Sequence, residues 1–376
     1  METKNSVMIT PPLQNFLGQR HVVHLYWIDL IRFVAAFLVV LCHFRGAFLP
    51  EYSNLPVEQH TPLVFLGYAL TRLGQEAVLI FFVMSGYLVA GRAIEKIHEG
   101  VFDLKNYCID RSVRIMLPLV SALMLYIPKE LICGNNILWK DWFGCLFSLQ
   151  GIWTGACIEP LWSLSYEVWF YIILGSSFAA LYSGKTKNKI IGFVVLVMCL
   201  LVFTKLLAHY LFIWLLGGLT YVSMPKKKNP WLLVGSTISL FVMITILQLT
   251  SGGHVTSSFV KYLPTQNRYS LELIYGLVFC VFLQQVVLIQ PKHLISLVAN
   301  NIGTKLAAFS YTLYLVHVLI MRILEHFGAV RAVALTMDSI LLYLLYTSIA
   351  LLACYGVYWC CERHTFTVKC WIKNRV

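Results

Sequence analysis

The sequence predicts an all-α protein, a polytopic transmembrane helical bundle of about ten spans. Hydrophobic residues make up 59% of the 376 residues and charged residues only 12%, whereas soluble domains carry about 25% charged residues. The mean hydropathy is +0.74. Apolar runs of about 20 residues recur along the chain, and in lipid such runs satisfy their backbone polar groups as helices.

Each predicted span is an apolar run close to the length that crosses a bilayer core. The fifth and sixth runs are separated by almost nothing around His209, so they form either a hairpin or one long segment. The predicted spans are 26–44, 74–91, 112–131, 160–182, 189–206, 208–224, 230–250, 269–290, 306–326 and 338–361.

The basic residues predict the orientation of the chain. With a cytosolic N-terminus, 19 of the 29 Lys and Arg residues fall in inner segments and 9 in outer segments, while Arg32 lies inside the first span. This bias indicates that both termini are cytosolic. It places the long connections 45–73, 132–159 and 251–268 outside. Because the net charge of +12 sits in short loops, it favours membrane orientation and anionic head groups over a nucleic-acid partner.

We expect one membrane domain, residues 26–363, between a cytosolic N-terminal tail, 1–25, and a cytosolic C-terminal tail, 364–376. No low-complexity tract or internal repeat interrupts this organisation. Most of the eleven cysteines stand alone in apolar runs, where cysteine behaves as a small hydrophobe. Since no C-x-x-C motif occurs, we predict no metal site.

The first span, YWIDLIRFVAAFLVVLCHF, carries Asp29, Arg32 and His43. A charge at the bilayer centre costs ~2.5–3.5 kcal/mol, so such residues usually face a polar interior and mark function. Arg32 and His43 are eleven residues apart, which places them on one helix face about 16 Å apart. Asp29 can pair with Arg32 one turn later. The alternative is that Arg32 snorkels to the inner surface and His43 marks the outer boundary.

Five further segments place polar residues in or beside spans. They are FFVMSGYL at 81–88, RSVRIMLP at 111–118, LWSLSYEVWFY at 161–171, SYTLYLVH at 310–317 and Glu-Arg at 362–363. With the D-L-x-R-x₁₀-H pattern of the first span, these six motifs resemble in order those of the acyltransferase-3 family of integral-membrane acyltransferases, in its stand-alone bacterial O-acetyltransferase form. His364 departs from the family pattern by replacing a proline.

The resemblance implies transfer of an acyl group, commonly acetyl, from acetyl-CoA or another acyl-CoA to a hydroxyl of a sugar or lipid-linked glycan. Many relatives append an extracytoplasmic esterase-like domain. Because this chain ends shortly after its last span, we expect it to act alone or with a separate partner. The lack of Asn-x-Ser/Thr glycosylation sites favours a multi-pass protein of a bacterial inner membrane. The protein can also form a homo-oligomer on this interpretation.

The motif residues of the inner half are Arg32, Ser85, Arg111, Arg114 and Glu362, and they suit a cofactor-binding site for CoA. Arginine offers a planar fork of donors for phosphate oxygens. Arg111 and Arg114 lie one turn apart and can grip one nucleotide end together, although ordinary flanking charges have the same spacing. Ser85 is expected to let two helices approach closely rather than to act as a nucleophile. Asp29 and Glu362 complete a polar network.

The motif residues of the outer half are His43, Glu167 and His317, and they suit chemistry on a hydroxyl. Histidine is the usual general base near neutral pH, and we assign this role to His43. Glu167 is expected to orient the imidazole. His317 shares a helix face with Tyr314 and either holds a substrate or is a core histidine.

Aromatic residues near these groups suit an acceptor sugar. Trp162, Tyr171, Tyr311 and Tyr314 can line a sugar-binding groove, although aromatic belts at the membrane interfaces explain such residues equally well. CoA cannot cross the bilayer, so we expect its pantetheine arm to thread from the inner arginines to His43. The alternative is relay of the acyl group on a side chain.

Two other classes of protein remain open on the sequence. A transporter or flippase of a glycan precursor or small metabolite also has many spans and intramembrane ionisable residues, although no inverted repeat is evident. A structural subunit of a glycan-assembly complex would tolerate replacement of His43. Consumption of acetyl-CoA in the presence of a glycan acceptor separates these classes from an acyltransferase.

Overall fold

The computed structural model describes residues 12–14, 20–22, 27–250 and 268–375, and it confirms a helical bundle. One small antiparallel hairpin joins β1 (Pro12–Gln14) to β2 (Arg20–Val22), with Leu13 opposite His21. The rest of the predicted N-terminal tail, and the predicted outer connection up to residue 267, lie outside the described residues.

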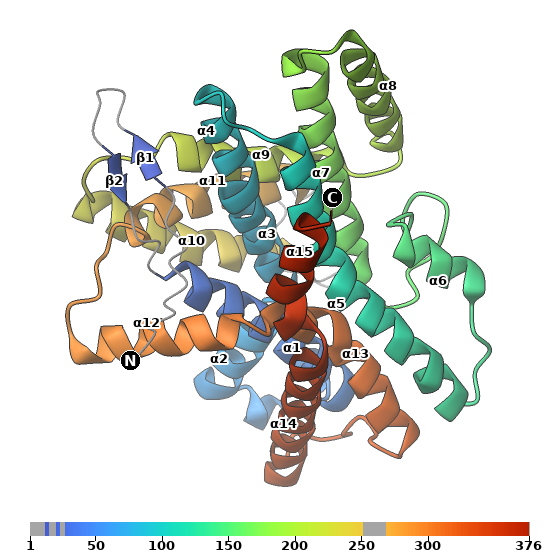
Figure 1. Cartoon of the computed structure of the whole chain (residues 1–376). Helices are drawn as coiled ribbons and strands as arrows, with labels where there is room; N and C mark the ends of the chain where they lie inside the picture. The colour runs from blue at the N-terminus through green and yellow to red at the C-terminus, as the bar shows by residue number, and fades with distance from the viewer. Residues whose placement is uncertain (1–11, 15–19, 23–26, 251–267, 376) are drawn as a thin grey trace, which may run out of the picture.

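Every predicted span is helical (Figure 1). The main helices of the predicted spans are α1 (Ile28–Phe48), α3 (Gly74–Ser85), α5 (Leu104–Ile132), α7 (Leu161–Tyr182), α8 (Thr186–Val202), α9 (Ala208–Val222), α10 (Pro230–Thr250), α11 (Arg268–Val286), α13 (Ser310–His326) and α14 (Met337–Cys360). The other helical elements are η1 (Tyr52–Asn54), η2 (Val57–Gln59), α2 (Pro62–Thr71), η3 (Gly86–Gly91), α4 (Arg92–His98), α6 (Trp139–Leu146), α12 (Leu294–Ala307), η6 (Glu362–His364) and α15 (Thr365–Lys373).

Within the described residues, seven helices are long and apolar enough to cross a membrane, or eight if α12 and α13 form one bent span. The difference from the ten predicted spans lies in α8 and α9, which have 17 and 15 residues. Large apolar side chains on the outside of the bundle are exposed, including Phe193 (62%), Phe241 (67%) and Leu352 (74%). This surface suits lipid, and the chain is therefore a multi-pass membrane protein.

A π-helical turn, η3, continues α3 and brings it against α9. Gly86 and Gly217 allow this contact, because a Cβ on Gly86 would lie 1.8 Å from the carbonyl oxygen of Trp214 and one on Gly217 would lie 2.1 Å from that of Val83. The prediction that the Ser85-Gly86 pair lets two helices approach closely is confirmed.

The expected ninth span is broken. α12 and α13 meet at an angle of 58° across residues 308–309. Figure 1 shows α12 running from the left edge of the bundle towards its middle, from where α13 continues to the lower right. The break leaves the carbonyl end of α12 and the amide end of α13 without helical partners in the interior of the protein.

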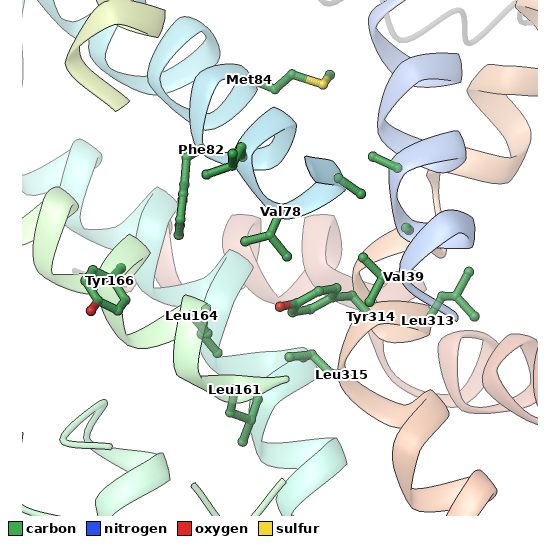
Figure 2. Packing of buried hydrophobic residues seen from close by; sticks show 14 of the residues in the cluster. Val39, Val78, Phe82, Met84, Leu161, Leu164, Tyr166, Leu313, Tyr314 and Leu315 are labelled. Atoms are coloured by element: carbon green, nitrogen blue, oxygen red, sulfur yellow. The ribbon is translucent and has the colours of Figure 1, made fainter. Parts of the chain in front are cut away.

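The core lies where α1, α3, α7 and α13 meet. Figure 2 shows Tyr314 of α13 between Val78 of α3 and Val39 of α1, with its hydroxyl directed towards α7. Leu313, Leu315 and Val316 on the same helix are fully buried. Burying apolar residues around a central helix in this way fixes the rotation of that helix, and with it the direction of its polar side chains.

α5 begins before the predicted third span, because the Asp103 side chain accepts a hydrogen bond from Asn106 N and caps the helix. The predicted C-terminal tail is not extended. It forms α15, whose Lys369 and Lys373 both pair with Asp110 of α5, at 3.0 and 2.9 Å.

Candidate functional site

His43 and His317 form the centre of the outer half of the site. His317 Nε2 lies 3.1 Å from His43 Nδ1, and the ring centroids are 5.0 Å apart. α1 carries His43 and α13 carries His317, and the two helices pack closely along their length. His317 is fully buried and His43 is half-buried.

The neighbouring carbonyl groups fix the tautomers of the neutral pair. His317 Nδ1 lies 2.9 Å from the Leu313 carbonyl oxygen, which can only accept, so His317 carries its proton on Nδ1. Its Nε2 is then an acceptor, and His43 Nδ1 must donate to it. The Val39 carbonyl oxygen, 3.0 Å from His43 Nδ1, accepts the same proton. His43 therefore presents an unprotonated Nε2, to which the described residues show no hydrogen bond.

Charged residues cover the side of the histidine pair that we predict to face outwards. Arg322, beyond His317 on α13, forms ion pairs with Glu325, at 2.9 Å, and with Glu159. Glu159 and Arg322 both interact electrostatically with His43. Glu159 lies in the segment just before α7, so this contact ties the outer end of α13 to the start of α7.

A second polar cluster lies between α3, α7 and α9. Ser85 Oγ donates to Glu167 Oε1 at 2.9 Å and lies 3.0 Å from the Tyr171 hydroxyl. Tyr171 also donates to Glu167. Trp214 Nε1 donates to Ser85 Oγ at 3.1 Å. Two hydroxyl groups thus donate to the Glu167 carboxylate, and an indole from a third helix donates to one of them, inside an apolar bundle.

This cluster corrects two expectations. Ser85 was predicted in the inner half and Glu167 in the outer half, but the two side chains are hydrogen-bonded and lie at one depth. Glu167 was predicted to orient His43, yet in the described residues its hydrogen bonds go to Ser85 and Tyr171, whereas those of His43 go to Val39 and His317. The prediction failed because spacing along α7 does not fix the rotation of α7 against α1.

The inner cluster forms at the broken helix. Arg32 donates through an Nη atom to the Ala307 carbonyl oxygen, at 3.1 Å, and pairs with Asp29 at 3.2 Å, as the spacing predicted. Glu362 accepts from Thr312 N at 3.0 Å and from Thr312 Oγ1 at 2.6 Å. A cation thus meets the carbonyl end of α12 and an anion the amide end of α13, as the dipoles of the two helices favour.

Unpaired donors remain around this inner cluster. Arg32 Nε and the Tyr311 hydroxyl are buried without a hydrogen-bond partner. Arg114 is exposed and interacts electrostatically with Arg32 and Glu362. Tyr311 interacts electrostatically with Glu167 as well as Glu362, so it lies between the two polar clusters. These donors fit an anionic, oxygen-rich ligand such as CoA.

Arg111 and Arg114 face different neighbours. The Arg111 guanidinium lies over the Tyr171 ring, 5.8 Å from its centroid. Arg111 and Tyr171 also line a cavity of about 460 Å³ between α5, α7 and α8. Arg114 faces Arg32 and Glu362 instead. The structure thus does not bring the two arginines together for a joint grip on one phosphate group.

Of the aromatic residues predicted to contact a sugar, Tyr314 lies close to the histidine pair, whereas Tyr171 belongs to the Glu167 cluster. Tyr314 lies 6.3 Å from His317, ring centroid to ring centroid. Its hydroxyl, however, is used within the protein, 2.6 Å from Ser163 Oγ and 2.9 Å from the Pro160 carbonyl oxygen. Trp162 is half-buried and lies 5.7 Å from the Tyr210 ring.

Sequence reasoning missed Thr312, Ser163 and Trp214. The first two stand inside the SYTLYLVH and LWSLSYEVWFY motifs, so the motifs themselves were the signal. Trp214 lies in an unremarkable apolar run, and nothing along the chain distinguishes it. In the described residues, no group of three or more His, Cys, Asp or Glu side chains has the arrangement of a metal site.

The comparisons with known proteins agree with this geometry. The model of the acyltransferase-3 family, described as an acyltransferase domain, matches residues 25–359 and so covers most of the chain. No curated protein and no solved structure gave a match. The matched range includes α1, the histidine pair, the Ser85–Glu167 cluster and Arg32 and Thr312 of the inner cluster, whereas Glu362 lies just beyond its end. The chain therefore belongs to the acyltransferase-3 family of integral-membrane acyltransferases.

Proposed function

We propose that the protein is a membrane O-acyltransferase that moves an acyl group, most simply acetyl, from cytosolic acyl-CoA to a hydroxyl of a cell-surface or lipid-linked glycan. The observation that carries the proposal is the contact between His43 and His317. Burying two imidazoles is costly unless they are hydrogen-bonded or used, and here one of them keeps an unprotonated nitrogen.

His43 is the general base in this proposal. Its Nε2 takes the proton of the acceptor hydroxyl while the hydroxyl oxygen attacks the thioester carbonyl. The carbon–sulfur bond then breaks, and the CoA thiolate leaves with the proton that His43 returns. Such positioned proton transfer contributes typically ~10²–10⁴-fold to a rate.

His317 takes the position in which we had expected Glu167. As His43 gains a proton on Nε2, its Nδ1–H donates more strongly to His317 Nε2, and the neutral second ring stabilises the imidazolium. This is the part that an acidic residue plays beside the histidine of a hydrolase triad. Glu167 instead holds Ser85 and Tyr171 between the two halves of the site.

The donor binds from the inner side. Arg32, Arg114 and Tyr311 offer unpaired or exposed donors for CoA phosphate and carbonyl oxygens, and Arg111 contributes from the neighbouring cavity. The acceptor binds on the outer side, near Trp162 and the ring of Tyr314. A direct transfer between the two sides needs only that the pantetheine arm pass the Ser85–Glu167 cluster.

Acyl transfer by the purified protein tests this function. The protein in lipid vesicles is given radiolabelled acetyl-CoA together with the lipid-linked glycans extracted from the producing cells. We expect alkali-labile label in the glycan and an equal amount of free CoA thiol. His43→Ala abolishes both products, whereas His326→Ala, a change at the exposed histidine that ends α13, leaves them unchanged.

The same vesicles distinguish the transporter hypothesis. A flippase would move the labelled glycan between the leaflets without releasing CoA thiol, and it would do so in the His43→Ala variant as well. Movement of the glycan without CoA release under these conditions would contradict the proposed function.

A further inference from the structure

Two cysteines contact each other in the connection between α6 and α7. The backbone N–H of Cys157 donates to Cys145 Sγ across 3.3 Å, and the two thiols are hydrogen-bonded. Cys145 is fully buried at the end of α6, and Cys157 is half-buried. The other described cysteines offer no comparable contact between two thiols. This pair therefore requires an explanation beyond the packing of single cysteines.

The surrounding loop is folded tightly, so the contact is built into it. Leu149 N donates to the Gly144 carbonyl oxygen at 2.7 Å, and Gly155 N donates to Asp141 Oδ1 at 3.0 Å. A Cβ on Gly144 would lie 2.0 Å from Thr154 Oγ1, which shows how closely the two sides of the loop approach. The loop holds the two sulfur atoms together before any bond joins them.

Positive charge places this loop outside the cytosol, since α5 enters the membrane from a segment rich in Lys and Arg. We propose that Cys145 and Cys157 form a disulfide bond in the extracytoplasmic space, made by exchange with a disulfide-bearing thiol oxidase. The inference does not depend on the acyl-transfer chemistry. It uses only the thiol contact and the orientation of the loop.

The chemistry follows ordinary thiol–disulfide exchange. The half-buried Cys157 loses its proton to solvent and attacks the disulfide of the oxidase, which releases one oxidase thiolate. Cys145 then attacks Cys157 Sγ and displaces the second thiolate. The two cysteines are oxidised and the oxidase disulfide is reduced to a dithiol. The backbone N–H of Cys157 still donates to Cys145 Sγ at this stage, and this hydrogen bond stabilises the thiolate that the second step needs.

The bond would brace the helix that carries the polar centre of the protein. The Ser148 carbonyl oxygen, three residues after Cys145, accepts from Ser165 Oγ and from Trp169 Nε1, each at 2.9 Å. Both donors lie on α7, on either side of Glu167 in sequence. Closing the loop holds the Ser148 carbonyl against α7. The disulfide bond also stabilises the folded state, because it restricts the conformations of the unfolded chain.

Mass spectrometry of the protein from living cells tests the proposal. Cells making the full chain are quenched with acid and alkylated with N-ethylmaleimide before lysis, and the protein is digested with chymotrypsin, which cuts at Phe147 and Trp153 between the two cysteines. We expect the Cys145 and Cys157 peptides as one species that a reductant separates. Cys360 and Cys361, at the inner end of the last span, should carry maleimide in the same sample.

Alkylation of a cysteine variant in cells and thermal unfolding with and without reductant test the disulfide bond independently. In Cys145→Ser, Cys157 becomes alkylated in cells, and the thermal midpoint in detergent falls below that of the intact chain. Dithiothreitol lowers the midpoint of the intact chain to that of the variant and leaves the variant unchanged. Maleimide on both Cys145 and Cys157 in cells, or equal midpoints with and without reductant, would overturn the proposal.

Discussion

His43 and His317 determine each other's protonation pattern. The Leu313 carbonyl holds the proton of His317 on Nδ1, which leaves Nε2 to accept from His43 Nδ1. The free nitrogen of His43 is thereby defined by a residue 274 positions away in the chain. At this scale the function depends on a single hydrogen bond between two rings in an apolar surrounding, where such bonds are strong.

Replacing His317 tests this dependence. His317→Gln keeps an acceptor near the position of Nε2, so we expect it to retain part of the turnover number, whereas His317→Leu leaves His43 Nδ1 with the Val39 carbonyl alone. Loss of a hydrogen bond to a charged intermediate costs about 1.5–3 kcal/mol, or roughly 10–100-fold in kcat. Steady-state kinetics of both variants measure it. Equal kcat values for Leu and Gln would contradict the assigned role.

Arg32 gives a second prediction at this scale. A lysine at position 32 offers one point charge in place of a fork that already serves Asp29 and Ala307. We therefore expect Arg32→Lys to raise the KM for acyl-CoA about tenfold or more, with a smaller change in kcat. Arg363→Lys is the matched control, because Arg363 stacks on Trp359 outside this cluster. An unchanged KM for Arg32→Lys would remove Arg32 from the donor site.

The sequence identified the residues of the site, but not which of them contact one another. Arg32 and His43 stand out because they are charged or ionisable inside an apolar run, and the Asp29–Arg32 pair follows from helical spacing. The pairing of His43 with His317, and of Ser85 with Glu167, depends on how α1, α3, α7 and α13 are rotated against one another. That rotation is decided by packing between helices far apart in sequence, which one chain does not reveal.

At the scale of elements, two features shape the interior. The break between α12 and α13 supplies unpaired backbone groups that bind Arg32 and Glu362. The contact between α3, with its π-helical turn, and α9 places Trp214 against Ser85. The sequence indicated the second feature through Ser85-Gly86. It did not indicate the break, because the apolar run continues through Ala307, Ala308 and Phe309 without a Gly or Pro.

Because α3 and α9 approach closely at Gly86, adding one methyl group there should reduce the stability of the protein. Gly86→Ala would drive its Cβ into the backbone of Trp214, so we expect a loss of about 1–3 kcal/mol in stability from overpacking. Gly235→Ala in α10 is the control, because nothing lies within 4 Å of its Cβ. Thermal unfolding in detergent compares them. A midpoint for Gly86→Ala equal to that of Gly235→Ala would contradict the contact.

At the scale of the whole molecule, the short helices α8 and α9 decide the number of spans. Their connection lies against α7, since the Leu207 N–H donates to the Tyr166 hydroxyl at 3.1 Å, and against the α6–α7 loop, since Leu206 lies 3.7 Å from the position of a Cβ on Gly151. Lys185 and Lys187, at the start of α8, belong to the basic residues that we predict on the inner side. The prediction of ten spans requires that both helices cross the membrane, although α8 and α9 are shorter than the seven or eight candidate spans of the described residues.

Labelling in intact cells tests this topology. In a Cys133→Ser background, we expect Thr204→Cys to react with a membrane-impermeant maleimide in intact cells, because residue 204 is exposed in the α8–α9 connection. Lys187→Cys, at the other end of α8, should react only after the membrane is permeabilised. Reaction of both positions only after permeabilisation would show that α8 and α9 stay on the inner side.

The central claim, that His43 is the base of an acyl transfer, is tested most directly by the rate of the His43→Asn protein. Asparagine can keep the donor of Nδ1 towards Val39 and His317 while removing Nε2. We predict that it binds acyl-CoA as the intact protein does but transfers the acyl group ~10²–10⁴-fold more slowly. A transfer rate within a few fold of the intact protein, with the protein equally folded, would contradict the account.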